Sequence, residues 1–243
     1  TQGLSAGDAE AVDRFFVAFE KHFRGDEKIL HAQLSDDYLD LLYTAKQQVG
    51  DLPCLDLGCG RGVWLRILRE AGFTAKGVDL NPGAIAQAQS QGLEAQVADA
   101  LAWLVSQPND SALAVTAFHL VEHIPFAMRL ALTQEAVRVL APGGVLIYET
   151  PNPENLWVGT HTFYHDPTHT QPLTPESLAF LTTYCGLEGV KILRLHPYPK
   201  EAAIPGIDAL TARVNGMTCN AQDFAVVAQK PLPSNHTTTP DGD

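Results

Sequence analysis

Histidine and acidic side chains gather in two stretches of the sequence, residues 118–123 and 150–174. These stretches hold five of the nine histidines, at positions 119, 123, 161, 165 and 169. The pKa of an imidazole lies near working pH, so His123 or His169 can take a proton from a hydroxyl. Alternatively, Glu122, His123 and His169 can bind a divalent ion that lowers the pKa of that hydroxyl directly. Either arrangement activates an oxygen atom.

The segment from Thr150 to Thr174 is long for a connection in a compact domain, and such loops are often functional. We expect His165 and Tyr164 in it to shape the pocket for the molecule that carries the hydroxyl. The alternative is a folded lid with internal hydrogen bonds, stiffened by its prolines. For Glu122 and His123 the alternative is a cap on the helix that follows them.

A strand, a glycine turn and an amphipathic helix follow one another in CLDLGCGRGVWLRILREAG, residues 54–72. The first two glycines let the backbone turn sharply and approach a ligand. Asp79 ends the next apolar run about 20 residues later, where a carboxylate can accept both hydroxyls of a ribose. A dinucleotide fingerprint needs a glycine at position 63, which is Val63, whereas Gly62 completes G-x-G-x-G. This spacing favours S-adenosylmethionine (SAM) over NAD.

Asp99 follows the third apolar run, where it is placed to accept a hydrogen bond from an adenine amine. The alternative is an N-cap for the next helix, which is the better interpretation of Asp99 taken alone. His119 follows the fourth run, near the expected position of the SAM sulfonium. The residues expected to contact the cofactor within this region are Asp56, Gly58, Cys59, Gly60, Gly62, Asp79, Leu80, Asp99, Ala100 and His119.

Short apolar runs alternate with amphipathic helices from residue 52 onward, which is typical of a parallel sheet covered on both faces. We predict an α/β fold, Rossmann-like, with a mostly parallel seven-stranded sheet and extra N-terminal helices within residues 9–45. The predicted strands are 54–57, 75–78, 95–97, 112–118, 145–149, 190–195 and 223–228. The predicted helices are 9–23, 27–43, 61–71, 82–91, 98–105, 127–140 and 175–185. Residues 141–144 are predicted to be a turn. One domain should span 1–230, with 231–243 a disordered tail or linker.

Composition excludes several classes of protein. A net charge of -12 would repel a phosphate backbone, so nucleic acid is not expected as a partner. The four cysteines form no Cys-x-x-Cys pair, which fits a reducing cytoplasm. No stretch approaches the ~18 apolar residues of a membrane span. The chain begins at Thr1 without Met, so we expect it to be either a trimmed chain or one domain of a larger glycan-synthesis protein.

The segments DLGCGRG, GVDLNP, VADAL, VEHIP, VLAPGG and ETPNPEN resemble the successive motifs of class I SAM-dependent methyltransferases over about residues 23–195. More narrowly, FRGDEKIL, ETPNPENL and FYHDPTHTQPLTPESL resemble bacterial methyltransferases of polysaccharide loci, often described as O-antigen chain terminators. This resemblance implies that Arg24 and Gly25 hold the methionine carboxylate of SAM, a task that suits a guanidinium. The usual pattern GRGEWL is broken here, because Val63 replaces the acidic residue.

The histidine cluster is similar to the metal-binding Glu-x-x-Glu-His group of ubiquinone-pathway and small-RNA O-methyltransferases. His119 stands where those enzymes have their first Glu, and His169 stands for the later His of the small-RNA enzymes. The resemblance implies a metal at Glu122, His123 and His169. Because the imidazole of His119 replaces a carboxylate, the metal preference of such a site would shift from magnesium toward zinc, manganese or iron.

We therefore expect a SAM-dependent O-methyltransferase that acts on a sugar hydroxyl at the end of a bacterial surface glycan such as lipopolysaccharide. His123 or His169 would be the general base or a metal ligand, and Glu122 would orient or ligate. One alternative is a quinone or small-phenol O-methyltransferase, which should have a more apolar lid. Another is a SAM-binding regulatory module of a larger polysaccharide-synthesis protein, in line with Val63.

Overall fold

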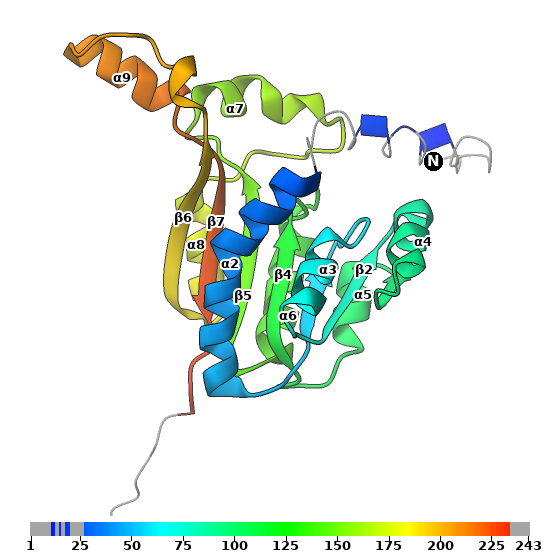
Figure 1. Ribbon diagram of the computed structural model, residues 1–243. Helices are drawn as coiled ribbons and strands as arrows, with labels where there is room; N and C mark the ends of the chain where they lie inside the picture. Colours follow the sequence, from blue (N-terminus) through cyan, green and yellow to red (C-terminus); the bar gives the residue numbers. More distant parts are fainter. Residues whose placement is uncertain (1–10, 13–14, 16–17, 20–26, 234–243) are drawn as a thin grey trace, which may run out of the picture.

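The computed structural model describes residues 11–12, 15, 18–19 and 27–233 of the 243-residue chain. In this part of the chain, seven strands form one sheet in the order β3-β2-β1-β4-β5-β7-β6 (Figure 1). The first five strands are parallel, whereas β7 runs antiparallel to both of its neighbours. The predicted Rossmann-like fold is confirmed.

The strands are β1 (Cys54–Leu57), β2 (Ala75–Asp79), β3 (Ala95–Val97), β4 (Ala112–Phe118), β5 (Leu140–Pro151), β6 (Glu188–Pro197) and β7 (Ala221–Gln229). The α-helices are α2 (Glu27–Val49), α3 (Val63–Glu70), α4 (Pro82–Ser90), α5 (Ala100–Val105), α6 (Phe126–Val139), α7 (Leu156–Thr160), α8 (Pro175–Tyr184) and α9 (Ala209–Thr218). Two short 3-10 helices are η1 (Thr162–His165) and η2 (Lys200–Ala202). Among the described helices, none is long and apolar enough to cross a membrane.

Helices cover both faces of the sheet. One apolar cluster joins α2 and α3 to the strands through residues such as Tyr38 and Trp64, and these helices lie in front of the sheet in Figure 1. A second cluster joins α5, α6 and α8 to the opposite face. Alternate side chains of the buried strands enter the two clusters, as Cys54 and Leu55 of β1 do. The sheet is therefore held rigidly between two apolar layers.

Three connections differ from the prediction. Residues 141–144 belong to β5, because the chain pairs with β4 from Leu140 and accommodates Gly143 as an irregularity in register. The segment 150–174 contains α7 and η1 and is not a plain loop. The helix α9 stands between β6 and β7, where no helix was predicted; none of its residues is buried, although Leu210, Val214 and Met217 are spaced as on one helical face.

The predicted N-terminal helix 9–23 lies only partly within the described residues. Those at 11–12, 15 and 18–19 are helical. Arg24, Gly25 and the end of the expected tail, 234–243, lie outside the described part of the chain.

Gly144 is the position where the bend at the start of β5 tolerates no side chain. An added Cβ would lie 2.8 Å from the carbonyl oxygen of Ala141 and 3.0 Å from that of Leu113. We predict that Gly144→Ala lowers the free energy of unfolding by about 1–3 kcal/mol, since backbone atoms would have to move. In urea denaturation, Gly216→Ala in α9 is the matched control, because nothing lies within 4 Å of its added Cβ. An unchanged midpoint for Gly144→Ala would contradict the tight bend.

Candidate functional site

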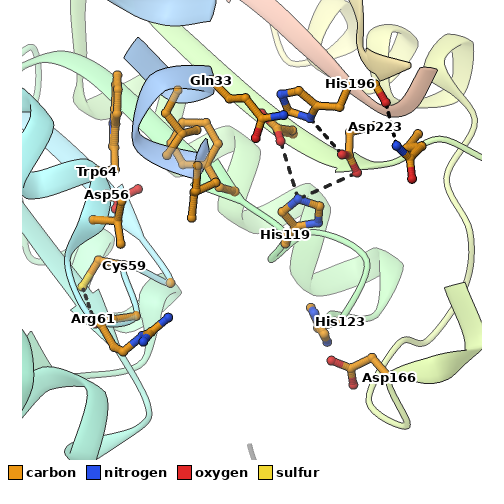
Figure 2. A pocket seen from close by; sticks show the side chains of 18 of the residues that line it. Gln33, Asp56, Cys59, Arg61, Trp64, His119, His123, Asp166, His196 and Asp223 are labelled. Carbon is orange, nitrogen blue, oxygen red and sulfur yellow. Dashed lines mark hydrogen bonds and ion pairs between the residues drawn. The ribbon is translucent and has the colours of Figure 1, made fainter. Parts of the chain in front are cut away.

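Two neighbouring cavities open at the carboxyl ends of the parallel strands, the edge where ligands of such sheets bind. The larger has a volume of about 550 Å³ and the smaller about 380 Å³. Gly58 and His123 line both of them. Figure 2 shows the larger cavity, with Cys59 and Arg61 on one side, His196 and Asp223 on the other, and His119 between them.

The glycine turn after β1 forms the floor between the cavities. Gly58, Gly60 and Gly62 all have positive φ, at 72°, 51° and 79°, a region that suits glycine. The carboxylate of Asp79 accepts the backbone N–H of Gly60 at 2.9 Å on one oxygen and that of Asn81 at 2.7 Å on the other. These bonds fix Asp79, and each oxygen keeps a lone pair for a ligand hydroxyl.

The smaller cavity has apolar walls and two carboxylates, which suits a nucleoside. Asp79 and Asp99 line it together with Leu80, Ala100 and Leu120. Asp99 also caps α5, because one of its oxygens accepts the N–H of residue 102 at 2.8 Å. Both interpretations of Asp99 therefore fit, since the cap occupies only one carboxylate oxygen.

Asp56 lies at the end of β1, under the glycine turn and against the larger cavity. It is 2 % exposed and accepts a hydrogen bond from the hydroxyl of Thr116 at 2.7 Å. Burial raises the pKa of Asp56 to about 7, although the Thr116 bond opposes the change. This carboxyl can thus change its charge near neutral pH.

The turn between β4 and α6 carries Glu122 into the protein interior. The buried guanidinium of Arg129 donates to the carbonyl oxygens of Val121 and Ile124, both at 2.9 Å. The carbonyl oxygen of Glu122 accepts the N–H of Thr170 at 2.9 Å. The segment 150–174 is therefore fastened to this turn, and Glu122, His123 and His169 come together with ligand atoms within 4.8 Å of one another.

Hydrogen bonds fix the ring nitrogens of the two histidines in this cluster. Thr168 donates its hydroxyl to Asp166 at 2.6 Å, so it accepts from Nδ1 of His123 at 2.8 Å. Nδ1 of His169 donates to the carbonyl oxygen of Phe163 at 2.5 Å. In both neutral rings Nε2 is then the basic nitrogen, and in His169 it lies 3.9 Å from Glu122.

His119 lies between three carboxylates. Its Nδ1 is 3.4 Å from Glu122, and its Nε2 is 3.5 Å from Glu149 and 3.9 Å from Asp223. Burial lowers the pKa of His119, but the acidic neighbours outweigh burial and raise it to about 10. Burial likewise raises the pKa of Glu122, and the contact with His119 brings it below its ordinary value. Each group therefore keeps the other charged.

A second histidine extends this network toward α2. Nδ1 of His196 lies 3.0 Å from Asp223, and Nε2 lies 3.1 Å from Asp37. Burial lowers the pKa of His196, but these carboxylates and Glu149 raise it to about 9. Tyr38 donates its hydroxyl to Glu149 in a buried hydrogen bond. Acidic and basic groups thus alternate across the cavity from α2 to the segment 150–174, which we call the lid.

Comparison with known proteins identifies the family to which the chain belongs. A family model described as a methyltransferase domain matches residues 27–192. The chain belongs to this methyltransferase family. A SAM-dependent methyltransferase from Archaeoglobus fulgidus has 28% sequence identity and a TM-score of 0.80, and the match covers 89% of this chain and 100% of that one. Residues 27–192 thus form a class I SAM-dependent methyltransferase domain.

Curated relatives match this chain over part of its length. A ubiquinone biosynthesis O-methyltransferase from Xanthomonas oryzae is 31% identical over 133 residues, which is 53% of this chain and 54% of that protein. A probable SAM-dependent methyltransferase from Mycolicibacterium smegmatis is 26% identical over 177 residues, covering 73% and 65%. The methyltransferase thus spans about half the length of the first of these relatives.

Three of the expected site residues line neither cavity: Glu122, Gly62 and Tyr164. Glu122 is fully buried. Gly62 is the N-cap of α3 and packs so closely on Leu93 that a Cβ would lie 2.6 Å away. Tyr164 does not line the larger cavity and is 63 % exposed, because its neighbour Phe163 in η1 takes the inward position. His165 does line that cavity. Gly62 therefore serves the turn, and Tyr164 does not shape the pocket.

Three acidic or basic residues of the site were missed by sequence reasoning. Glu149, His196 and Asp223 line the larger cavity. Glu149 ends an apolar run just as Asp79 does, so this signal was available. His196 and Asp223 belong to an antiparallel pair whose position in the sheet the sequence pattern does not reveal.

The pKa of Asp56 predicts how stability depends on pH. The unfolded chain ionises this group near its model value of 3.8, while the folded protein keeps the proton until about pH 7. The free energy of unfolding should therefore fall as pH rises from 4 to 7, by at most roughly 4 kcal/mol. We expect Asp56→Asn to gain stability relative to wild type between pH 5 and pH 8 in urea denaturation. Parallel pH profiles for the two proteins would contradict this origin.

Proposed function

We propose that this methyltransferase transfers the methyl group of SAM to a hydroxyl oxygen of a polar acceptor, such as a sugar at the end of a glycan. The main support is the Glu122–His123–His169 cluster. It provides basic nitrogens of fixed orientation in a cavity that adjoins the nucleoside-shaped one. Such a cluster suits the removal of a proton from an oxygen.

The residues present fit SAM. Asp79 would bind the ribose hydroxyls and Asp99 the adenine amine, with Leu80 and Ala100 against the base. Gly58, Cys59, Gly60 and Asp56 would lie along the methionine part, where Arg24 and Gly25 are expected to bind the carboxylate. When bound, SAM supplies an electrophilic methyl group on its sulfonium sulfur.

His169 would act as the general base. The carbonyl oxygen of Phe163 holds its Nδ1 proton, so Nε2 takes the hydroxyl proton. Glu122, 3.9 Å away, would stabilise the imidazolium that forms. His123 would share this task, and His165 would contact the acceptor. In the alternative, the same three residues hold a divalent ion; their ligand atoms converge well enough for that role.

Part of the lining of the larger cavity suits a hydroxyl-rich acceptor. Beside the histidines it presents Gln33, Thr162, Asp166, Gln222 and Asp223, which can bind hydroxyl groups. The same cavity also has apolar walls, among them Leu30, Trp64 and Phe118, which part of the cofactor or an aromatic ring can contact. A phenolic acceptor is the second candidate, because several curated relatives are named ubiquinone biosynthesis O-methyltransferases. The polar side chains of the cavity thus support the sugar, whereas its apolar side chains and the names of the relatives support the phenol.

Transfer of label from SAM tests the proposal. Purified enzyme should methylate a glycan acceptor in a panel that also contains a catechol, with the product found by mass spectrometry. His169→Ala should lower kcat at least a hundredfold, because proton removal is lost. His161→Ala, a histidine of the same lid that does not line the cavity, is the control. Tight SAM binding without transfer to any acceptor would instead favour a regulatory module.

Cofactor binding gives a prediction that needs no acceptor. We expect Asp79→Asn to raise the dissociation constant of SAM at least tenfold, since the amide accepts only half as many hydrogen bonds. Isothermal titration calorimetry measures this change. Asp51→Asn, at an exposed carboxylate remote from both cavities, is the matched control. Equal affinity in both variants would remove Asp79 from the ribose site.

A further inference from the structure

Three potential ligand atoms converge on the far side of His119 from Glu122. His119, Glu149 and Asp223 each offer one such atom, and these atoms lie within 4.8 Å of one another. Nε2 of His119 faces Oε1 of Glu149 and Oδ1 of Asp223. His119 follows β4, Glu149 lies in β5, and Asp223 lies near the start of β7, so three neighbouring strands hold them. Figure 2 shows the side chains of His119 and Asp223 pointing toward each other.

The spacing of these atoms suits ligands of an ion better than direct hydrogen bonds. The Nε2 atom lies 3.5 Å from Glu149 and 3.9 Å from Asp223. A charged N–H···O bond would bring such atoms to about 2.7–2.9 Å. Ligands about 2.1 Å from a tetrahedral ion are about 3.4 Å apart. Only a small inward movement of Asp223, which is partly exposed, separates the observed arrangement from that geometry.

In each of these three side chains, the nitrogen or oxygen atom that is not offered to the ion contacts a further residue. Nδ1 of His119 faces the carboxylate of Glu122 at 3.4 Å, and Oδ2 of Asp223 faces His196 at 3.0 Å. The other oxygen of Glu149 accepts the hydroxyl of Tyr38. Metal-bound histidines and carboxylates are commonly oriented in this way, and a carboxylate–histidine pair is the usual form.

Glu122 supports His119 as a ligand from the side opposite the proposed site. Its side chain is fully buried, neither of its oxygens has a hydrogen-bond partner among the described residues, and it is aimed at Nδ1 of His119, 3.4 Å away. Without a metal, His119 itself carries the charge that compensates Glu122. Binding of a cation at Nε2 would release the Nε2 proton to solvent, while Nδ1–H stays directed at Glu122 and the cation supplies the positive charge. The larger cavity supplies an entry path.

We propose that His119, Glu149 and Asp223 form a binding site for a divalent cation, distinct from the Glu122–His123–His169 cluster. One imidazole and two carboxylates favour Zn²⁺ or Mn²⁺ over Mg²⁺. The three protein ligands leave coordination positions open toward the cavity, where an acceptor oxygen can bind. The site does not depend on the identity of the acceptor, and its failure would leave the proposed methyl transfer untouched.

Manganese binding tests the site without any acceptor. In a His169→Ala background, which weakens the neighbouring cluster, metal-free protein is titrated with Mn²⁺ and free Mn²⁺ is measured by electron paramagnetic resonance. We expect one bound ion per chain, displaced by Zn²⁺, and nitrogen coupling from an imidazole in the pulsed spectrum. Adding Asp223→Asn or Glu149→Gln should weaken binding tenfold or more, because a charged ligand is lost.

The control removes a charge from the same cavity without touching the three ligands. Asp166→Asn, in the same background, should change Mn²⁺ affinity less than threefold. Circular dichroism and thermal midpoints show whether each variant is folded, and the imidazole coupling identifies the site in the folded background protein itself. Absence of Mn²⁺ and Zn²⁺ binding in that protein would overturn the proposal, as would equal losses in Asp166→Asn and Asp223→Asn.

Discussion

A carboxylate that is fully enclosed by protein needs nearby compensation, since its desolvation costs several kcal/mol. Glu122 is such a group, and its compensation comes from the charged imidazole of His119 at 3.4 Å. Because His119 follows β4, this pair holds the turn before α6 against the edge of the sheet. The segment 150–174 packs on the same turn, where Nε2 of His169 lies 3.9 Å from Glu122. Thr170, bonded to the backbone of Glu122, secures the same contact.

The cofactor half of the site depends on local features, which is why it could be predicted from sequence. β1, β3 and β4 begin and end where their apolar runs do. The glycine turn, Asp79 and Asp99 follow those runs directly, so their position at one edge follows from parallel pairing. Gly62 shows the limit of such reasoning, because a glycine needed for φ and for packing looks the same as one that contacts a ligand.

The acceptor half depends on pairing between distant segments. Because β7 is antiparallel, its first residues meet the edge where the parallel strands end, and Asp223 pairs with Pro151 and Leu195. No local pattern reveals that order of strands. The roles of Tyr38 and Asp37 were missed for another reason, because the sequence of α2 is that of a leucine-rich helix that packs on the sheet. Sequence reasoning thus found His119 and Glu122 but missed His196 and the carboxylates Glu149 and Asp223 that face both histidines.

His119 connects the two halves through its backbone as well as its ring. It has a φ of 51°, a conformation that costs a non-glycine residue about 1 kcal/mol or more, and its N–H donates to the carbonyl oxygen of Glu149. This conformation places one imidazole between Glu122 on one nitrogen and Glu149 with Asp223 on the other. Methyl transfer itself needs little more than alignment and loss of a proton. A charged cage of this extent exceeds what proton removal requires, and in the proposed function it would orient the acceptor.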